Sequence, residues 1–280
     1  MIQVAGIDEM RHHVATARNA GQTVALVPTM GCLHRGHRSL FAVARRQSDF
    51  FVVSIFVNPL QFGPTEDFDL YPRTPEDDAA ICRKEGVALL FSPEPETMYA
   101  PDHSVVVEET SLSRGLCGAH RSGHFRGVTT VVAKLFNIVQ PDIAVFGQKD
   151  AQQTAIIRRM VRDLNIPVRI VAAPTIRESD GLALSSRNRL LDHDTRRRAT
   201  VIHHALCAAL ESYRRGERDA GRIRRDIVSR IEEQPSFSVE YAAAIDAGTL
   251  QPVSRLRSNV LLAVAVRTGN VRLIDNVSIA

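Results

Sequence analysis

The sequence is poor in lysine and has no paired cysteines. Three of its 35 lysine and arginine residues are lysines, namely Lys84, Lys134 and Lys149, so each of them invites a specific role. The four cysteines form no Cys-x-x-Cys pair, and no nearby histidines complete a zinc spacing. This excludes the common metal–thiolate sites. Scattered thiols are expected to stay reduced, so no disulfide framework is predicted.

Long apolar runs are absent as well. No apolar segment approaches the ~18 residues needed to cross a bilayer, and the N-terminus lacks the basic start and apolar core of a signal peptide. We therefore expect a cytoplasmic protein without a membrane partner. With 44% hydrophobic and 24% charged residues, the composition is that of an ordinary globular protein. A chain of 280 residues suffices for one large domain or two smaller ones.

The net charge of +4 raises the question of a nucleic-acid partner. Arginines cluster at 158–159, 196–198 and 224–225, but acidic residues lie among or near them. Such mixed clusters favour solvated helix faces over a nucleic-acid footprint. We expect a small anionic ligand at most and no nucleic acid. A non-catalytic basic module that binds RNA is the alternative from another functional class.

The order of the apolar segments predicts a doubly wound parallel sheet in the first part of the chain. Strands alternate there with helices, such as those expected at 37–47 and 128–139, which is typical of α/β folds. The strands are expected at 23–29, 50–57, 87–91, 105–107, 143–146 and 168–172.

The pattern changes after Pro174 and predicts a second, smaller α+β domain. The expected elements are helices at 194–213 and 221–233 and strands at 239–245, 260–266 and 271–274. Because helices and strands do not alternate here, a separate α+β unit fits better than a continued parallel sheet. We predict a domain of residues 1–176 and a second domain of residues 177–280.

The stretch from Pro28 to His37 is the one around which the chain is organised. It joins a strand to a helix through a tight glycine loop, and such a helix N-terminus is where α/β proteins collect phosphate. His34 and His37 are three residues apart, so helical spacing directs both imidazoles to one side of the loop. Two surface histidines beside a helix cap are the alternative. Cys32 is expected to be a small residue in a turn, not a nucleophile.

A second loop, Gly147 to Asp150, also ends a strand and opens a helix. Lys149 offers a compact positive charge to a polyphosphate, and its rarity in this chain strengthens that interpretation. Asp150 either caps the helix or contacts a ribose or a metal ion.

A third polar loop, 181–189, lies at the predicted domain junction. Ser185, Ser186 and Arg187 offer two hydroxyls and a guanidinium in sequence, which can close over phosphate oxygens. No Gly-x-Ser-x-Gly elbow or partnered triad accompanies these serines, so they are not predicted to be nucleophiles.

Two glutamines and one further motif complete the set of candidates. Gln61 follows the second central strand and Gln153 lies in the helix after Lys149. Their carboxamides suit a small acid that carries hydroxyls, although either glutamine alone fits a surface position better. The stretch 124–127, His-Phe-Arg-Gly, is a candidate for ligand binding or for contacts between two copies.

Together these motifs resemble the pantothenate synthetase (pantoate–β-alanine ligase) family of the His-x-Gly-His nucleotidylyl-transferring superfamily. The resemblance covers nearly the whole chain, with several motifs in the same order and spacing. The motifs that carry it are Pro28 to His37, Phe56 to Phe62, Tyr71 to Thr74, Gly123 to Gly127, Phe146 to Asp150, Asp180 to Arg187 and Arg272 to Asn276.

The resemblance implies a Rossmann-like domain, a C-terminal lid domain and a homodimer. It implies an ATP-dependent ligase that joins (R)-pantoate to β-alanine with Mg²⁺. The carboxylate of pantoate attacks the α-phosphate of ATP, pyrophosphate leaves, and the amine of β-alanine attacks the acyl-adenylate to give pantothenate and AMP. A rival within the superfamily is an adenylyltransferase whose product retains the adenylyl group.

The resemblance also implies roles for individual residues. The implied ATP contacts are Met30, Gly31, Cys32, Leu33, His34, Arg35, Gly36, His37, Gly147, Gln148, Lys149, Asp150, Ile176, Leu184, Ser185, Ser186 and Arg187. Of these, the residues with an implied part in catalysis are His34, His37, Lys149, Ser185, Ser186 and Arg187. The implied pantoate contacts are Gln61 and Gln153, with Gln61 also reaching β-alanine, and the implied metal ligands are Asp77 and Asp78.

The sequence departs from the family pattern at a few positions near the implied site. Ile81 stands where a further polar metal ligand is expected, and Cys32, Leu60 and Ala151 replace other residue types. His37 occupies the family's proton-donor position. Because carboxylate attack on phosphate needs no proton, we expect His37 to act through charge stabilisation and hydrogen bonding.

Overall fold

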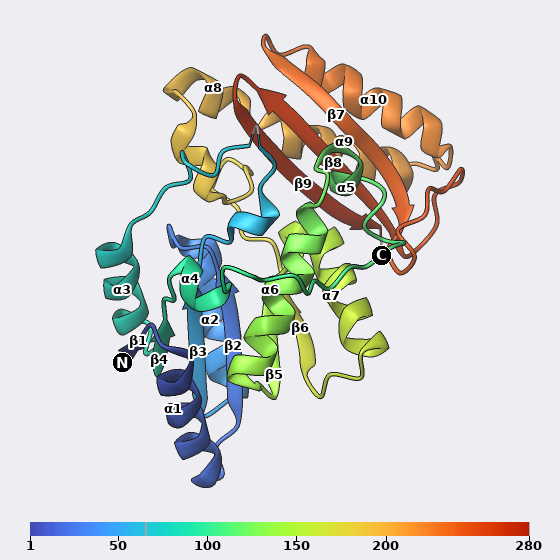
Figure 1. Ribbon diagram of the computed structural model, residues 1–280. Helices are drawn as coiled ribbons and strands as arrows, with labels where there is room; N and C mark the ends of the chain where they lie inside the picture. The colour runs from blue at the N-terminus through green and yellow to red at the C-terminus, as the bar shows by residue number, and fades with distance from the viewer. Residues whose placement is uncertain (65, 280) are drawn as a thin grey trace.

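The structure is a computed structural model that describes residues 1–64 and 66–279. Its N-terminal part contains a six-stranded parallel sheet, which confirms the predicted fold class (Figure 1). The strands are Ile2–Val4 (β1), Val24–Thr29 (β2), Phe50–Ile55 (β3), Leu89–Phe91 (β4), Ile143–Gly147 (β5) and Arg169–Ala173 (β6). Their order is β1-β4-β3-β2-β5-β6. Because the order reverses between β2 and β5, the loops after these two strands meet at one edge of the sheet.

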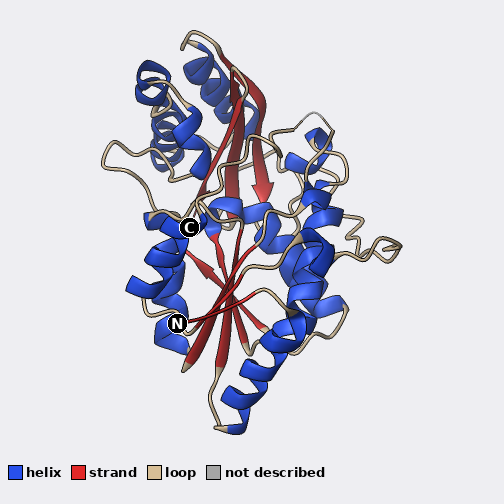
Figure 2. Ribbon diagram, turned by 60° about the vertical axis from the view of Figure 1, so that its left-hand side comes forward, coloured by secondary structure: helices blue, strands red, loops and turns tan. Residues whose placement is uncertain are grey.

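Alternate side chains of the central strands enter two different cores. Val24 and Leu26 of β2 face one core, whereas Ala25 and Val27 face the other, as the two-residue period of a strand requires. Helices therefore cover both faces of the sheet (Figure 2). The long helices are Ile7–Asn19 (α1), Arg35–Gln47 (α2), Pro75–Lys84 (α3), His124–Val139 (α6) and Ala151–Asp163 (α7). The first core packs under α1, α6 and α7, and the second under α2 and α3.

Short helical elements connect the strands to the long helices. They are Pro59–Gln61 (η1), Pro95–Met98 (α4), Cys117–His120 (α5), Gln148–Asp150 (η2) and Ser186–Leu190 (η3). Three of them, η1, η2 and η3, contain residues that the sequence analysis singled out, namely Gln61, Lys149 and the pair Ser186 and Arg187. The predicted polar loops are thus partly wound into single helical turns.

The C-terminal part contains three helices and an antiparallel sheet of order β7-β8-β9. Its elements are His193–Arg198 (α8), Val201–Arg214 (α9), Ala220–Glu232 (α10), Phe237–Asp246 (β7), Val260–Thr268 (β8) and Val271–Ile279 (β9). Leu262 and Val264 of β8 enter a core with α9 and α10, while Leu261 and Ala263 enter the first core of the N-terminal part. This sheet is therefore buried on both faces and joins the two parts of the protein.

Some details differ from the sequence-based expectations. The expected helix 194–213 is two helices, α8 and α9, and the hydroxyl of Thr200 donates to the carbonyl of Arg197 at the break. The expected strand 105–107 is extended but pairs with no strand, because the N–H and C=O of Val107 bond to threonine side chains of α6. The domain boundary after residue 176 stays a prediction. Within the described residues, no helix is long and apolar enough to cross a membrane.

Gly127 marks a close approach between α6 and η1. A Cβ atom at this position would lie 2.2 Å from the carbonyl oxygen of Leu60 and 2.6 Å from the amide nitrogen of Gln61. Both neighbours are backbone atoms, so an added methyl group forces η1 away from the helix. The last residue of His124 to Gly127 thus has a packing reason to be glycine.

We predict that Gly127→Ala lowers the free energy of unfolding by about 1–3 kcal/mol, the usual cost of an overpacked contact. The loss is expected although alanine gains about 1 kcal/mol of helix propensity over glycine. Urea unfolding followed by circular dichroism measures the change. Gly115→Ala is the control, because its Cβ would meet open space. Equal stability of the two variants contradicts the close approach.

Candidate active site

A cavity of about 230 Å³ opens at the carboxyl ends of β2 and β5. It brings together residues from all of the predicted polar loops. The predicted site residues that line it are Met30, His34, Gly36, His37, Gln61, Gly147, Lys149, Asp150, Gln153, Ile176, Leu184, Ser185, Ser186 and Arg187. Within the described chain, the cavity lining does not include the other predicted ATP contacts, which are Gly31, Cys32, Leu33, Arg35 and Gln148.

A buried carboxylate holds the loop that follows β2. Gly31 and Cys32 both have positive φ, at 79° and 49°. The N–H groups of Cys32 and Leu33 point toward α3. There Asp78 accepts from the N–H of Cys32 at 2.9 Å and from that of Leu33 at 2.7 Å. Asp78 is 1% exposed, so these bonds are shielded from water. The loop is thus held by a residue from a distant helix.

The predicted metal ligands do not come together as a metal site. Both oxygens of Asp78 accept from the loop backbone, and Asp77 is exposed on the other side of the helix turn. Within residues 1–64 and 66–279, no group of three or more histidine, cysteine, aspartate or glutamate side chains could hold a metal ion. These two acids therefore do not fit a magnesium site of their own.

His34 and His37 form a reciprocal cap on α2. The Nδ1 atom of His34 accepts from the N–H of Gly36 at 3.1 Å, and the N–H of His34 donates to Nδ1 of His37 at 3.2 Å. The two ring centroids are 4.1 Å apart. Because each Nδ1 is an acceptor, a neutral ring carries its proton on Nε2. The predicted pair of imidazoles is therefore a pair of oriented N–H donors.

Burial keeps both imidazoles neutral. It lowers the pKa of His34 to about 4, with smaller contributions from the charges of Lys149 and Arg189. Burial also lowers the pKa of His37 to about 3, with smaller contributions from His34 and Lys149. The positive charge near the loop therefore comes from Lys149 and Arg189, and at neutral pH the histidines contribute dipoles.

The η3 turn closes the cavity from the side of the C-terminal part. The Ser186 hydroxyl donates to the carbonyl of Cys32 at 3.2 Å, which ties η3 to the loop after β2. Arg187 makes two hydrogen bonds to Asp67, at 2.7 and 2.9 Å. Burial lowers the pKa of Arg187, but the pairing with Asp67 outweighs it and the net pKa is raised. Arg187 is therefore fully charged and already partnered.

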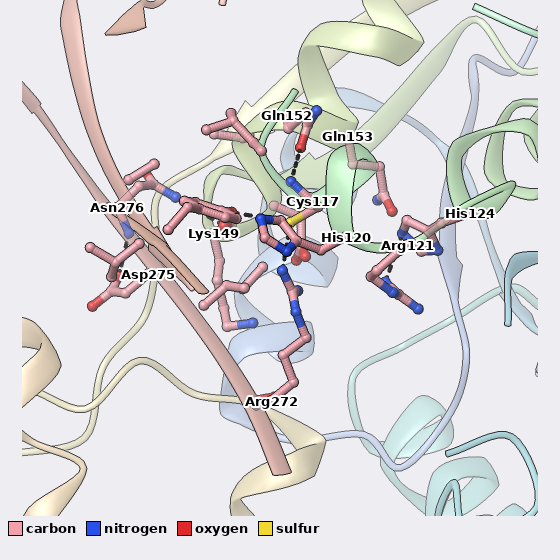
Figure 3. Close-up of a pocket in the computed structure, with 18 of the residues that line it drawn as sticks. Cys117, His120, Arg121, His124, Lys149, Gln152, Gln153, Arg272, Asp275 and Asn276 are labelled. Carbon is pink, nitrogen blue, oxygen red and sulfur yellow. Dashed lines mark hydrogen bonds between the residues drawn. The ribbon is translucent and has the colours of Figure 1, made fainter. Parts of the chain in front are cut away.

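Gln61 is held at both its side chain and its backbone. Its carboxamide nitrogen lies 2.8 Å from Sδ of Met30, and its carboxamide oxygen accepts from Asn58 at 3.3 Å. The Gln61 carbonyl accepts from Nδ1 of His124 at 2.8 Å. The Nε2 atom of His124 lies 2.9 Å from Nη1 of Arg121 and accepts from it (Figure 3). Acceptance by Nε2 requires a neutral ring with its proton on Nδ1, and burial, followed by the charge of Arg121, lowers the pKa of His124 to about 4.

The sequence analysis missed the roles of Asn58 and Arg121 and left His124 without one. Arg121 is paired with Glu66 through two hydrogen bonds, at 2.8 and 2.5 Å. The local signals were the motif 56–62, which contains Asn58, and the motif 124–127, which was flagged for binding or dimer contacts. Its histidine donates to the carbonyl of Gln61, and its glycine leaves room for η1. Both residues therefore act on the η1 turn.

A second cavity, of about 240 Å³, adjoins the first. The two share Lys149, Asp150, Gln153, Ser185 and Arg187 as lining residues. Its other walls include α5 and the C-terminal sheet, with the guanidinium of Arg272 directed toward Cys117 and His120 (Figure 3). The polar site thus extends to the junction of the two parts of the protein.

The first cavity also has an apolar wall. The residues of this wall are Val128, Val131, Val132 and Leu135 of α6 together with Phe56. A small acid with a branched hydrocarbon part can bury its carbons there and bond to the carboxamides. Its acid group would then lie near the N–H donors of the loop after β2, which are of the kind that bind phosphate.

The neutral histidines predict a pH dependence of stability. His34, His37 and His124 have folded-state pKa values of about 3–4, below the unfolded value of 6.5. Unfolding therefore takes up protons between these values, so stability is complete above about pH 6.5 and falls as the pH is lowered. The slope is about 1.4 kcal/mol per pH unit for each histidine.

Urea titrations between pH 5 and 6.5 measure this slope, and NMR of the imidazoles follows each protonation. His124→Asn, which keeps a donor toward Gln61, is expected to reduce the slope by about 1.4 kcal/mol per pH unit, the contribution of one histidine. Imidazoles of His34, His37 and His124 that titrate near pH 6.5 contradict the prediction.

The chain is similar to known proteins over its whole length. The family model for pantoate-beta-alanine ligase matches residues 3–278. The pantothenate synthetase of Moorella thermoacetica is 52% identical over 271 residues, which cover 97% of this chain and 96% of that protein. The one from Clostridium novyi is 49% identical over 276 residues, covering 99% and 98% of the two chains.

Solved structures agree with the sequence comparisons. Pantothenate synthetase from Thermus thermophilus superposes with a TM-score of 0.95 at 45% identity and covers 99% of both chains. Pantoate-beta-alanine ligase from Francisella tularensis, solved with Beta-gamma ATP and β-alanine, has a TM-score of 0.80 at 32% identity and covers 99% of this chain and 97% of that one. With this similarity added to the fold and to the loops that meet at β2 and β5, the chain belongs to the pantoate–β-alanine ligase family.

Proposed function

We propose that the cavity at the ends of β2 and β5 activates (R)-pantoate with ATP and passes the acyl group to β-alanine. As a member of its family, the protein is an ATP-dependent ligase that forms an amide bond and releases AMP and pyrophosphate. The observation that carries the assignment to this cavity is the convergence of His34, His37 and Lys149 beside Gln61 and Gln153.

The chemistry needs no protein nucleophile. A carboxylate oxygen of pantoate attacks the α-phosphorus, and the bond from phosphorus to pyrophosphate breaks. The amine of β-alanine then attacks the acyl carbon, the bond to the AMP oxygen breaks, and the amine loses a proton. Positioning of the reactants and stabilisation of phosphate charge can supply the rate enhancement.

For ATP, we propose contacts along the three loops. Met30 to His37 and Gly147 to Asp150 hold the nucleotide from the sheet, Ile176 lies by the adenine, and Leu184 to Arg187 close over the phosphates. The Nε2–H groups of His34 and His37 donate to phosphate oxygens, and Lys149 supplies the charge. Arg187 reaches phosphate by exchanging its bonds to Asp67.

His37 stabilises charge in this scheme and does not donate a proton. Its pKa of about 3 leaves it neutral, and a neutral imidazole loses its Nε2 proton far less readily than an imidazolium does. This supports the expectation from the sequence.

For the acid substrates, we propose Gln61 and Gln153 as the groups that hold pantoate. The apolar wall on α6 contacts its hydrocarbon part, and the carboxamides bond to its oxygens. Gln61 also contacts β-alanine when the acyl-adenylate is in place. The Cys32, Leu60 and Ala151 substitutions leave these polar groups present.

We further propose that Mg²⁺ accompanies ATP and neutralises part of its polyphosphate charge. Asp77 and Asp78 do not fit as a metal site, so the ion is held chiefly by the phosphates. A cytoplasmic homodimer is the proposed state of the protein, in keeping with the family resemblance.

Substitution of His37 tests the role of the imidazole. His37→Gln, which retains an N–H donor, is expected to keep at least ~10-fold more activity than His37→Ala, because loss of one donor to developing charge costs about 10²–10³ in rate. Single-turnover formation of pyrophosphate from ATP and pantoate measures this step. Equal losses in the two variants contradict the assignment.

The products test the reaction as a whole. With ATP, Mg²⁺ and pantoate alone, one equivalent of pyrophosphate is expected per site, and AMP is expected only after β-alanine is added. AMP that forms equally without β-alanine contradicts the acyl-adenylate scheme. An adenylyl group retained in the final product supports the adenylyltransferase alternative instead.

A further inference from the structure

Asn276 links the C-terminal sheet to the loop that carries Lys149. It lies on β9 and is 7% exposed. Its carboxamide nitrogen donates to the carbonyl of Gln148 at 3.1 Å and to the carbonyl of Lys149 at 2.9 Å (Figure 3). One side chain from the C-terminal part therefore satisfies two consecutive carbonyls of η2.

Asn276 is itself held in place by charged neighbours. Its N–H donates to Oδ1 of Asp275 at 2.7 Å, and its carbonyl accepts from Arg177 at 3.4 Å. Asp275 is 4% exposed and accepts two bonds from Arg177, at 2.6 and 2.9 Å. Arg177 lies on the segment that connects the two parts of the protein. The backbone that carries the carboxamide is thus held by the ion pair of the buried Asp275 with the half-buried Arg177.

The η2 turn needs such support. It is three residues long, and no side chain caps its N-terminus. Two fixed carbonyls set the peptide planes on either side of the Lys149 Cα atom, and these planes determine the direction of its side chain. Lys149 lines both cavities, and its charge is felt at both His34 and His37.

We propose that Asn276 is a positioning residue that orients Lys149 toward the phosphates of bound ATP. The C-terminal sheet then completes the phosphate site through hydrogen bonds to backbone, without a charged group of its own. The inference rests on the proposed function, because it assigns Lys149 to the phosphates. Asn276 is uncharged, so its removal leaves the charge of the site unaltered and acts through the placement of η2, which carries Lys149.

Kinetics of the Asn276→Ala variant test this role. The expected result is a fall of ~10- to 100-fold in kcat for pantoate-dependent pyrophosphate release, since a misplacement of about 1 Å costs up to 10²-fold. The KM for pantoate, which Gln61 and Gln153 govern, should change less than about 2-fold. Ser278→Ala is the control, because Ser278 is exposed on the same strand and lines neither cavity.

A double-mutant cycle with Lys149→Met separates positioning from stability. If Asn276 acts through Lys149, then Asn276→Ala reduces single-turnover rates in the natural chain but has no further effect beside Lys149→Met. NMR gives a second signature, because displacement of the Lys149 charge lets the pKa values of His34 and His37 rise. If Asn276 has only a structural role, Asn276→Ala shows no coupling to Lys149→Met and leaves these two pKa values unchanged.

Each outcome decides between the proposals. Independent, multiplicative losses in the cycle, or unchanged kcat in folded Asn276→Ala, overturn the inference. If Lys149→Met itself retains full activity, the proposed function of Lys149 is wrong. Should Asn276→Ala prove too unstable to purify, Asn276→Asp repeats the test, because it keeps the side-chain shape but replaces the donor by an acceptor.

Discussion

The reversal of strand order between β2 and β5 is the constraint on which the site depends. Two adjacent parallel strands whose connections leave in opposite directions open a crevice at their carboxyl ends. In this protein the loops that border the crevice carry the histidine pair on one side and Lys149 on the other. Each loop is then held from outside the crevice, by Asp78 on α3 and by Asn276 on β9.

In the proposed ATP site, this arrangement divides the work of binding phosphate. The imidazoles are buried and neutral, so they offer directed N–H groups without adding repulsion between positive charges. Lys149 and Arg187 provide the charge. Arg187 is paired with Asp67 in the described structure, so its engagement with a phosphate is coupled to the loop that contains Asp67.

The sequence predicted the parts of the protein that have a local pattern. Apolar runs predicted the parallel sheet and its strands β2 to β6, and glycine, histidine and lysine at strand ends predicted the loops that line the cavity. The pattern failed where contacts join distant segments. The family resemblance implied Asp77 and Asp78 as metal ligands, but only the fold shows that Asp78 faces two backbone N–H groups.

The same reason explains the residues that were missed. His124 and Asn276 act by holding backbone carbonyls of Gln61, Gln148 and Lys149, and a bond between a side chain and a distant carbonyl leaves no periodic trace. The segment 105–107 looked like a strand because it is β-branched. Its backbone groups instead bond to Thr129 and Thr130, whose hydroxyls a strand pattern does not reveal.

Isotope transfer from pantoate tests the central claim most directly. Pantoate labelled with ¹⁸O in its carboxylate is incubated with ATP, Mg²⁺, β-alanine and the enzyme, and the AMP is analysed by mass spectrometry. Attack of the carboxylate on the α-phosphate predicts that one labelled oxygen appears in each AMP. AMP without label, formed together with pantothenate, contradicts an acyl-adenylate in this site.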